Sequence, residues 1–300
     1  MARLAKAKFK KATWFDWVLV GFMVLVCIAT LYPFLHVLAV SLNDATDSIR
    51  GGITIWPREF TWQNYQHIFQ TNDSLVIAFR NSVLRTVIGT VTGLISCAIL
   101  AYTLSRKNFI LKRPISVMMV ITMYIAGGLI PGFLLIRNLG LMDTFAVYII
   151  PTLIAPFNVI VIRSFMEGLP GELEESAKMD GANDFTIFWK VIMPLCLPVL
   201  ATVALFIAVG QWNSWFDTYL FARRSPNLTT LQFELMRILT SAQITQAPLN
   251  PLSAEVVANR VSPVSIRMAI TIVATVPILL VYPFLQKYFV SGLTIGAVKG

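Results

Sequence analysis

Six long runs of apolar residues without Asp, Glu, Lys or Arg dominate this 300-residue chain. Each run meets or approaches the ~20 residues that a helix needs to cross the hydrocarbon core of a bilayer. Only 13% of the residues are charged, whereas soluble domains contain about 25%. We therefore expect an all-α integral membrane protein with six transmembrane helices. The six runs are Trp17–Val40, Thr86–Ser105, Pro114–Ile136, Thr144–Ile162, Val191–Phe216 and Met268–Gln286.

Basic residues flank these runs unevenly and predict the orientation. Residues 1–16 carry five Lys and Arg side chains, and residues 106–113 carry four. Because short cytoplasmic segments are enriched in Lys and Arg, we expect both to be cytoplasmic. Residues 1–16 are then a basic cytoplasmic arm, 17–290 the six-helix domain and 291–300 a cytoplasmic tail, so both termini are cytoplasmic. Topology also explains the net charge of +9, and no nucleic-acid partner is expected.

Glycine and proline within the runs predict close contacts and bends. Gly89 with Gly93, and Gly128 with Gly132, have the four-residue spacing that lets two membrane helices approach closely. Proline cannot donate an intrahelical hydrogen bond. We therefore expect Pro131 to bend the third run, and the two prolines at 151 and 156 to bend the fourth.

Motifs for catalysis or for nucleotide binding are missing from the sequence. With only two histidines, the chain has no His-Glu-x-x-His zinc helix, and it has neither a Gly-x-Ser-x-Gly elbow nor a Walker A loop. No acidic residue lies within the runs, which disfavours an ion-coupled carrier. We expect a non-enzymatic chain without a metal or cofactor of its own, so energy for uphill transport would come from another polypeptide.

A short charged segment, Glu174–Ala182, separates the fourth and fifth runs. Proline before it and glycine near its end are typical of a helix with Pro170 in its first turn and Gly181 just past its end. We expect Gly181 to adopt a left-handed backbone. Residues three and four apart share one face, and this face has small residues at its centre. It consists of Leu173, Ser176, Ala177 and Asp180.

This segment resembles the signature of ABC-importer permeases, which reads Glu-Ala-Ala, three residues, Gly, nine residues, Ile-x-Leu-Pro. Glu175, Ala177, Gly181 and Pro194 stand at the matching positions. Departures from the pattern are size-tolerant: Ser176 replaces Ala, Val191 replaces Ile and Met193 replaces Leu.

The C-terminus strengthens the resemblance. Residues 292–300 are similar to the tail of MalG-type sugar permeases. Within these, the whole chain is most similar to the LplC/YtcP-like group, whose members serve oligosaccharide uptake. The resemblance implies a heteromeric complex in the bacterial cytoplasmic membrane. Its other parts would be a second related permease, two ATPase subunits that bind ATP and Mg, and an extracytoplasmic sugar-binding protein.

The same resemblance implies that the charged helix enters a cleft of an ATPase and couples nucleotide closure to the transport path. The residues that it assigns to this coupling are Leu173, Glu175, Ser176, Ala177, Asp180, Gly181 and Ala182.

Residues that contact a sugar are harder to assign. Aromatic faces and amides are the groups that hold sugars, and the runs contain several of them. Packing or anchoring at the membrane interface explains each of these residues equally well. Two other classes of protein stay open as alternatives, a self-contained secondary carrier or channel and an intramembrane enzyme. The candidates for the substrate path are Tyr124, Asn158, Trp212, Asn213 and Trp215.

Overall fold

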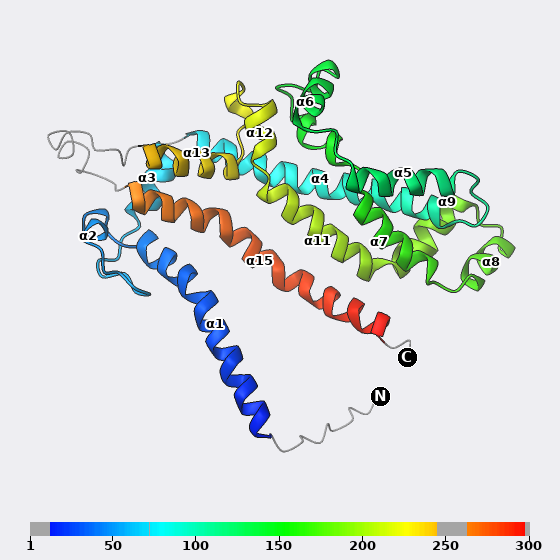
Figure 1. Cartoon of the computed structure of the whole chain (residues 1–300), viewed down its shortest axis with the longest axis horizontal. Coiled ribbons are helices and arrows are strands. Elements are labelled where there is room, and N and C mark those ends of the chain that lie inside the picture. The colour runs from blue at the N-terminus through cyan, green and yellow to red at the C-terminus, as the bar shows by residue number, and fades with distance from the viewer. Residues whose placement is uncertain (1–12, 72, 245–262, 298–300) are drawn as a thin grey trace. The chain divides into compact units, whose positions relative to one another are not determined.

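The computed structural model describes residues 13–71, 73–244 and 263–297, and Figure 1 shows them as a succession of helices. They divide into two compact units. Unit one contains residues 13–67 and 263–272, and unit two contains residues 68–71, 73–244 and 273–297. The long helix α15, Pro263–Ala297, contributes its first residues to unit one and the rest to unit two.

Unit one begins with α1, Trp14–Ser41, whose apolar side chains are exposed along most of its length. Thr13 is the N-cap residue of this helix, and its backbone N–H and its hydroxyl both donate to Asp16 Oδ2 at 2.6 Å. The short helix α2, Ala45–Ile49, follows.

A network of hydrogen bonds from asparagine side chains holds the segment after α1 in place. Asn43 Nδ2 donates to Asp47 Oδ2 at 2.9 Å, and Asn43 Oδ1 accepts from the N–H of Glu59. On α3, Gln63–Thr71, Asn64 Nδ2 donates to the carbonyls of Ser41 and Asn43, each at 2.9 Å. Buried polar groups must be paired, so these contacts allow the polar segment to fold compactly.

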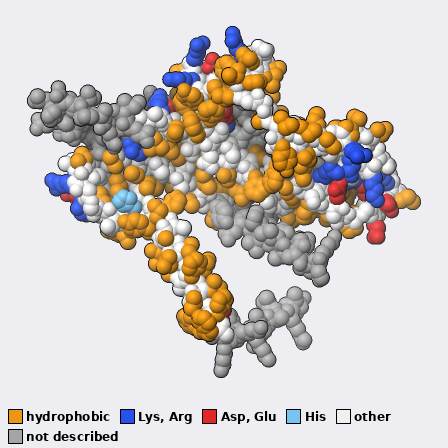
Figure 2. Space-filling view, viewed as in Figure 1, with side chains coloured by type: hydrophobic (Ala, Val, Ile, Leu, Met, Phe, Trp, Pro, Cys, Tyr) orange, Lys and Arg blue, Asp and Glu red, His pale blue; other side chains and the backbone are white. Residues whose placement is uncertain are grey.

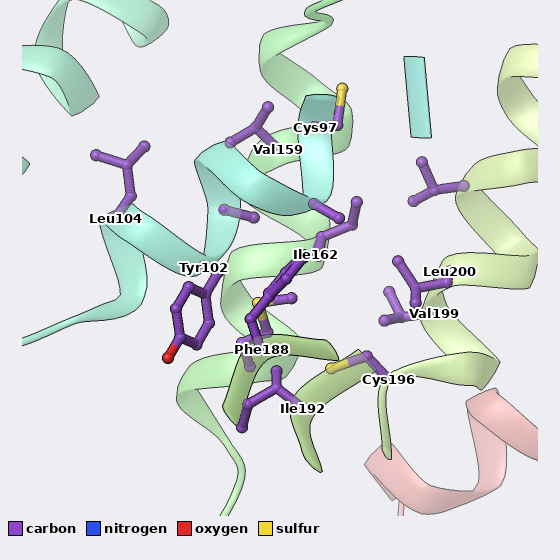
Figure 3. Close-up of a cluster of buried hydrophobic side chains, with 14 of the residues drawn as sticks. Cys97, Tyr102, Leu104, Val159, Ile162, Phe188, Ile192, Cys196, Val199 and Leu200 are labelled. Atoms are coloured by element: carbon purple, nitrogen blue, oxygen red, sulfur yellow. The ribbon is translucent and has the colours of Figure 1, made fainter. Parts of the chain in front are cut away.

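Unit two is built on α4, Asp73–Ser105, which packs against α7, Pro156–Glu167, and α11, Leu197–Asn213. Small buried residues on α4, Cys97, Ala98 and Ala101, let the other helices approach closely. Figure 3 shows how the side chains of α4, α7 and α11 meet in this core.

Apolar side chains also cover much of the visible surface (Figure 2). Exposed apolar surface on this scale is unusual for a soluble protein and agrees with a membrane location.

The remaining helices of unit two are short. In chain order they are α5 Lys112–Tyr124, α6 Leu129–Asn138, the 3-10 helices η1 Phe145–Tyr148 and η2 Ile150–Thr152, α8 Glu172–Met179, α9 Asp184–Ile187, the π-helical turn η3 Phe188–Ile192, α10 Met193–Leu195, α12 Phe216–Phe221, the 3-10 helix η4 Pro226–Leu228 and α13 Leu231–Ile244.

The six predicted runs lie on these helices, but half of them are broken. Among the described residues, three helices are long and apolar enough to cross a membrane, or up to five if each of two bent pairs counts as one span. The fourth run bends by 47° before Pro156, as expected, and the fifth bends by 83° between Leu195 and Leu197.

The third run breaks earlier than Pro131. Helix α5 ends at Tyr124, the backbone is extended at Ile125, and α6 begins after Gly128 with Pro131 inside its first turns. The expected bend at Pro131 was therefore wrong. Gly128 has a φ of 87°, a conformation that glycine adopts without strain, so glycine rather than proline determines the break.

The two glycine pairs behave differently. A Cβ atom at Gly89 would lie 2.8 Å from the side chain of Gln211, and one at Gly93 would contact Ile207 at 3.6 Å. This pair therefore permits the close contact of α4 with α11, as predicted. At Gly132 an added Cβ atom meets nothing within 4 Å among the described residues, so this glycine marks no close helix contact.

Candidate functional site

The charged segment between the fourth and fifth runs forms α8, Glu172–Met179. Gly171 is its N-cap residue, and Pro170 lies one residue earlier rather than in the first turn. The carbonyl of Pro170 accepts from the N–H of Leu173 at 3.4 Å. The helix lies at one end of unit two, beside α9 (Figure 1).

The C-terminal end of α8 forms a Schellman motif. The N–H of Ala182 donates to the carbonyl of Ala177, and that of Gly181 to the carbonyl of Lys178, each at 3.0 Å. Gly181 has a φ of 80°, which confirms the predicted left-handed backbone. These bonds satisfy carbonyls that a helix end would otherwise leave unpaired, so α8 ends sharply at Met179.

Ion pairs tie α8 to the end of α4. Arg106, just after α4, forms a salt bridge with Glu174, and Lys178 Nζ lies 2.9 Å from the other oxygen of this carboxylate. The Arg106 guanidinium lies over the ring of Tyr102, 4.3 Å from its centroid. Cation–π contact and ion pairing together fix the guanidinium, so α8 is held to α4 through a side chain of restricted mobility.

The predicted docking face is divided between the core and the surface. Ala177 is half-buried and packs against the core of unit two together with Ala182. Ser176, Asp180 and Gly181 are exposed, as are Glu175 and Leu173. Met179 is 89% exposed. Ala177 therefore helps to hold the helix in place, and the exposed residues of the predicted face remain available to a partner together with Met179. Their role in coupling stays a prediction.

Helix α9 continues the same surface. Asn183 caps it, since its Oδ1 accepts from the N–H of Thr186 at 2.8 Å. Phe185 is 71% exposed, and with Trp189 it lines a shallow pocket of about 230 Å³. The other lining residues are Ile99, Tyr102, Asp184 and Phe188.

A second ionic cluster joins the ends of α5 and α7 nearby. Glu167 Oε1 lies 3.0 Å from both Lys112 Nζ and Arg163 Nε, and Arg163 Nη1 donates to Ser116 Oγ at 2.7 Å. Desolvation raises the pKa of Glu167, but the hydrogen bonds from Lys112 and Arg163 outweigh it and leave this pKa below its usual value. The Glu167 carboxyl group is therefore ionised at neutral pH.

The five candidates for the substrate path do not form one group. Tyr124 ends α5 and is 84% exposed, whereas Asn158 is buried in α7. Trp212 is buried and donates from Nε1 to the carbonyl of Ala274 on α15 at 2.9 Å. Asn213 is exposed and accepts from Gln232 Nε2 at 3.3 Å, and Trp215 is half-buried. Their role in sugar transport stays a prediction.

A pocket of about 650 Å³ lies between α4, α11 and α15. Trp212 lines it, with apolar residues such as Val87, Phe206 and Ile278. The lining offers a sugar little hydrogen bonding.

A buried arginine at the other end of the bundle escaped sequence reasoning. Arg85 on α4 is 1% exposed. Its Nη2 lies 2.5 Å from Asp217 Oδ2, and both Nε and Nη2 donate to Gln211 Oε1. Its guanidinium lies 4.5 Å from the ring centroid of Tyr148, and Nη1 donates to the carbonyl of Ser214 at 3.4 Å. Four polar and aromatic groups therefore surround one charge.

The position of this arginine explains why it was missed. Arg85 directly precedes the second run and Asp217 directly follows the fifth, so the search for uncharged runs excluded both. The sequence signal for this buried ion pair was one positive and one negative residue, each next to the end of a run. Two neighbours on α4 also fasten the loop before α13. Asn81 Nδ2 donates to the carbonyls of Asn227 and Thr229, and Ser82 Oγ accepts from the N–H of Leu231.

Comparisons with known proteins agree on one family. Residues 74–295 match the family of the binding-protein-dependent transport system inner membrane component. The chain is 37% identical over 286 residues to the polygalacturonan/rhamnogalacturonan transport system permease protein YtcP of Bacillus subtilis, covering 95% of this chain and 98% of that protein. It is 30% identical to the arabinooligosaccharides transport system permease protein AraQ of Halalkalibacterium halodurans, covering 98% of this chain and all of that one.

Among solved structures, the chain is similar to one from a bacterial ABC transporter involved in the import of the acidic polysaccharide alginate. The TM-score is 0.82 at 30% identity, over 92% of this chain and 96% of that one. These matches confirm the resemblance inferred from the residues around Glu175 and Gly181. The chain belongs to the binding-protein-dependent transport system inner membrane component family, and it is a multi-pass membrane permease.

Proposed function

We propose that this chain is one of two permease subunits of an ATP-driven importer of oligosaccharides, and that α8 receives the movement of an ATPase subunit. The observation that carries the proposal is the way in which α8 is fixed to the rest of unit two. The helix is capped by a Schellman motif, its Glu174 is bonded to Arg106 after α4, and its opposite surface is exposed. A helix fixed on one side can transmit a rigid-body shift that acts on its other side.

The remaining parts of the complex are those that membership of the binding-protein-dependent transport family implies. Two partner ATPase subunits would bind ATP and Mg and hydrolyse the nucleotide. A second related permease would complete the path, and an extracytoplasmic binding protein would deliver the sugar. The relatives named for polygalacturonan and arabinooligosaccharides support a carbohydrate substrate.

The orientation of the chain is part of this proposal. The basic residues of the N-terminal arm and of residues 106–113 favour the cytoplasm of a bacterial cell for both termini and for α8. Residues 217–266 then face outward and contact the binding protein. Residues 245–262 of this segment lie outside the described part of the chain.

A self-contained secondary carrier is the less favoured function. Such a carrier needs an ion site within the membrane. In the described bundle, the buried charge of Arg85 is bonded to Asp217, and the buried carboxylate of Glu234 is bonded to Thr229 and Arg237. Neither pair offers a free carboxylate to a cation.

One pair of variants tests the coupling surface directly. Met179→Asp places a charge on the exposed side of α8, and Ile110→Asp is its control, because Ile110 is 93% exposed in the segment between α4 and α5. In proteoliposomes with both permeases, the ATPase dimer and the binding protein, we expect M179D to lower sugar-stimulated ATP hydrolysis about tenfold, the effect of ~1.4 kcal/mol. I110D should behave like the wild type. Equal activity of M179D and the wild type would exclude α8 as the docking element.

A further inference from the structure

Four aromatic side chains cluster at the end of the bundle that carries Arg85. Phe216 and Tyr219 on α12 lie one helical turn apart, with ring centroids 6.2 Å apart and planes inclined by only 28°. Trp215 contacts both rings, and the ring centroid of Phe233 on α13 lies 6.5 Å from that of Tyr219. Phe216 and Tyr219 are each 43% exposed, so the cluster presents aromatic surface rather than burying it.

Two arginines follow directly after α12. The Arg223 guanidinium lies 5.2 Å from the ring centroid of Tyr219, and Arg224 is exposed beside it. Neither forms an ion pair within the described residues. Arg137 in the last turn of α6 adds a third exposed cation, and α6 packs on α12 through Phe133 and Phe221, whose ring centroids are 6.1 Å apart. Figure 2 shows Lys and Arg side chains gathered over the region where Figure 1 draws α6 and α12.

The carboxylates of this region are already engaged. Asp217 is bonded to Arg85, Glu234 to Arg237, and Asp143 Oδ1 accepts from the hydroxyl of Ser225 at 3.1 Å. The arginines therefore retain donors for an external anion. A guanidinium can bind a carboxylate through two parallel hydrogen bonds.

Two amides adjoin the cluster, that of the exposed Asn213 at the end of α11 and that of the half-buried Gln232 on α13. Asn213 and Gln232 are bonded to each other at 3.3 Å, and each amide has more donors and acceptors than this one bond uses. Aromatic faces, amides and unpaired guanidinium groups are the chemistry that recognises sugar rings carrying carboxylates. Ring faces pack against the C–H side of a sugar, the amides bond its hydroxyls, and arginine binds the acidic group.

Hydrogen bonds at the junction of α11 and α12 restrict the movement of the aromatic cluster. The backbone leaves the helical conformation at Ser214, which separates α11 from α12. Arg85 crosses this hinge, since it bonds Gln211 before it, the Ser214 carbonyl within it and Asp217 after it. The buried Arg85 side chain therefore helps to fix the direction of α12, together with the packing of Phe221 on Phe133.

We infer that Phe216, Tyr219 and Arg223 form a binding surface for an acidic oligosaccharide, one that carries uronate groups, at the outer mouth of the transport path. This inference rests on the proposed function and specifies the class of its substrate. Asn213 and Trp215, which the sequence suggested for the substrate path, lie beside this surface, whereas Tyr124 and Asn158 do not belong to it.

The test compares an acidic with a neutral probe in the complete transporter reconstituted in proteoliposomes. The probes are trigalacturonate and maltotriose, matched in number of rings, each supplied with a binding protein that delivers it. For Arg223→Gln, we expect import of trigalacturonate to fall about tenfold, which corresponds to one charge-assisted hydrogen bond. For Tyr219→Ala, we expect a fall of about tenfold as well, because the variant loses the ring on which the sugar packs. Import of maltotriose, relative to the wild type, should fall less with Arg223→Gln than with Tyr219→Ala.

Matched controls separate binding from anchoring at the membrane interface. Tyr219→Phe keeps the ring and should import trigalacturonate like the wild type. Trp62→Ala removes an exposed aromatic residue of unit one, and Arg80→Gln removes an exposed cation of α4. Both should leave the ratio of acidic to neutral import unchanged.

The outcomes distinguish this inference from the proposed function. If the wild-type complex imports neither probe with ATP, the proposed function fails. If it imports sugar but Tyr219→Ala and Arg223→Gln leave the ratio unchanged, only the binding surface is refuted. The inference is also overturned if excess binding protein restores import by both variants, because the surface then docks a protein rather than a sugar.

Discussion

At the scale of single residues, the charges that matter most are those removed from water. Arg85 is almost completely buried, and its guanidinium is bonded to a carboxylate, an amide and a carbonyl while it covers an aromatic ring. Isolated charges are very costly inside a bilayer, and they persist only where partners neutralise them. Breaking such a pair on one side leaves the other charge buried and unpaired.

We therefore predict that Arg85→Met destabilises the purified chain by about 3 kcal/mol, the lower end of the range for broken buried pairs, because Asp217 keeps 19% of its side chain exposed. The double variant R85M/D217L should recover more than half of this loss, since two apolar side chains replace the pair. Lys178→Met is the control, as its i,i+4 pair with Glu174 is partly solvated and is worth less than about 1 kcal/mol. Thermal unfolding in one detergent measures all three. Equal stability of R85M and the wild type would show that the network is not structural.

Asp47 provides a prediction on pH. The hydrogen bond from Asn43 and, after it, the interaction with Arg58 hold the pKa of Asp47 below its usual 3.8, although desolvation acts in the opposite direction. A carboxylate with a lowered pKa stabilises the fold above its unfolded pKa, and this contribution is lost as pH falls through the folded pKa. Protection of amides 42–60 from hydrogen exchange, corrected for intrinsic rates, should thus be constant from pH 7 to about 5 and fall below about 3.8. In Asp47→Asn, the loss of protection at acidic pH should be smaller than in the wild type, because the titrating carboxyl group is gone. A pH profile of protection equal to that of the wild type would refute the role of Asp47.

At the scale of elements, the sequence was most informative where local chemistry decides the conformation. The left-handed backbone at Gly181 and the bend before Pro156 were predictable, because glycine and proline restrict the backbone wherever they occur. Contacts between distant segments were not predictable. Ala177 packs against the buried core of unit two, and the helical pattern alone could not reveal which residues of α8 a partner would find free.

The third run shows the same limit. Its composition predicted one continuous helix bent at Pro131, yet the break lies at residues 125–128. Proline is tolerated in the first turn of a helix, where its missing N–H has no partner to lose. Pro131 is therefore compatible with an unbent α6, and the sequence offered no local reason to prefer the glycines at 127 and 128.

Two glycines at the ends of α8 allow a matched test of this element. Gly181 has a φ of 80°, whereas Gly171 has a φ of −63°, and an added Cβ atom meets nothing within 4 Å at either position. Steric crowding is thus absent from both, and only the backbone conformation differs. Gly181→Val should strain the left-handed residue by about 1–2 kcal/mol, whereas Gly171→Ala should cost little.

We expect Gly181→Val to lower the number of sugar molecules imported per ATP hydrolysed, because a displaced α8 no longer transmits the movement of the ATPase. Gly171→Ala should keep the wild-type ratio. Gly181→Asn should lie between them, since asparagine tolerates the left-handed region better than valine. If valine at 181 preserves coupling in reconstituted complexes, the Schellman end of α8 has no role in transport.

At the scale of the whole molecule, the exposed surfaces of the chain are typical of a subunit that works in a larger complex. Helix α1 is exposed along nearly its entire length within the described structure, and the exposed side of α8 is separate from the core that holds it. Helix α15 continues to Ala297, so residues 291–297, expected as a separate tail, extend this helix. Residues 298–300 of the expected tail lie outside the described residues.

The chain by itself should neither hydrolyse ATP nor transport sugar. It lacks a Walker A sequence, and its buried charged groups within the described bundle are engaged with one another, so no ion gradient has an evident site to act on. Purified chain in liposomes should therefore show no ATPase activity and no uptake of radiolabelled oligosaccharide with ATP, a proton gradient or a sodium gradient. The same preparation should gain both activities when the second permease, the ATPase dimer and the binding protein are added together, and omission of any one should abolish uptake. Gradient-driven uptake by the chain alone would instead establish a secondary carrier, because no other polypeptide would then be needed to supply the energy.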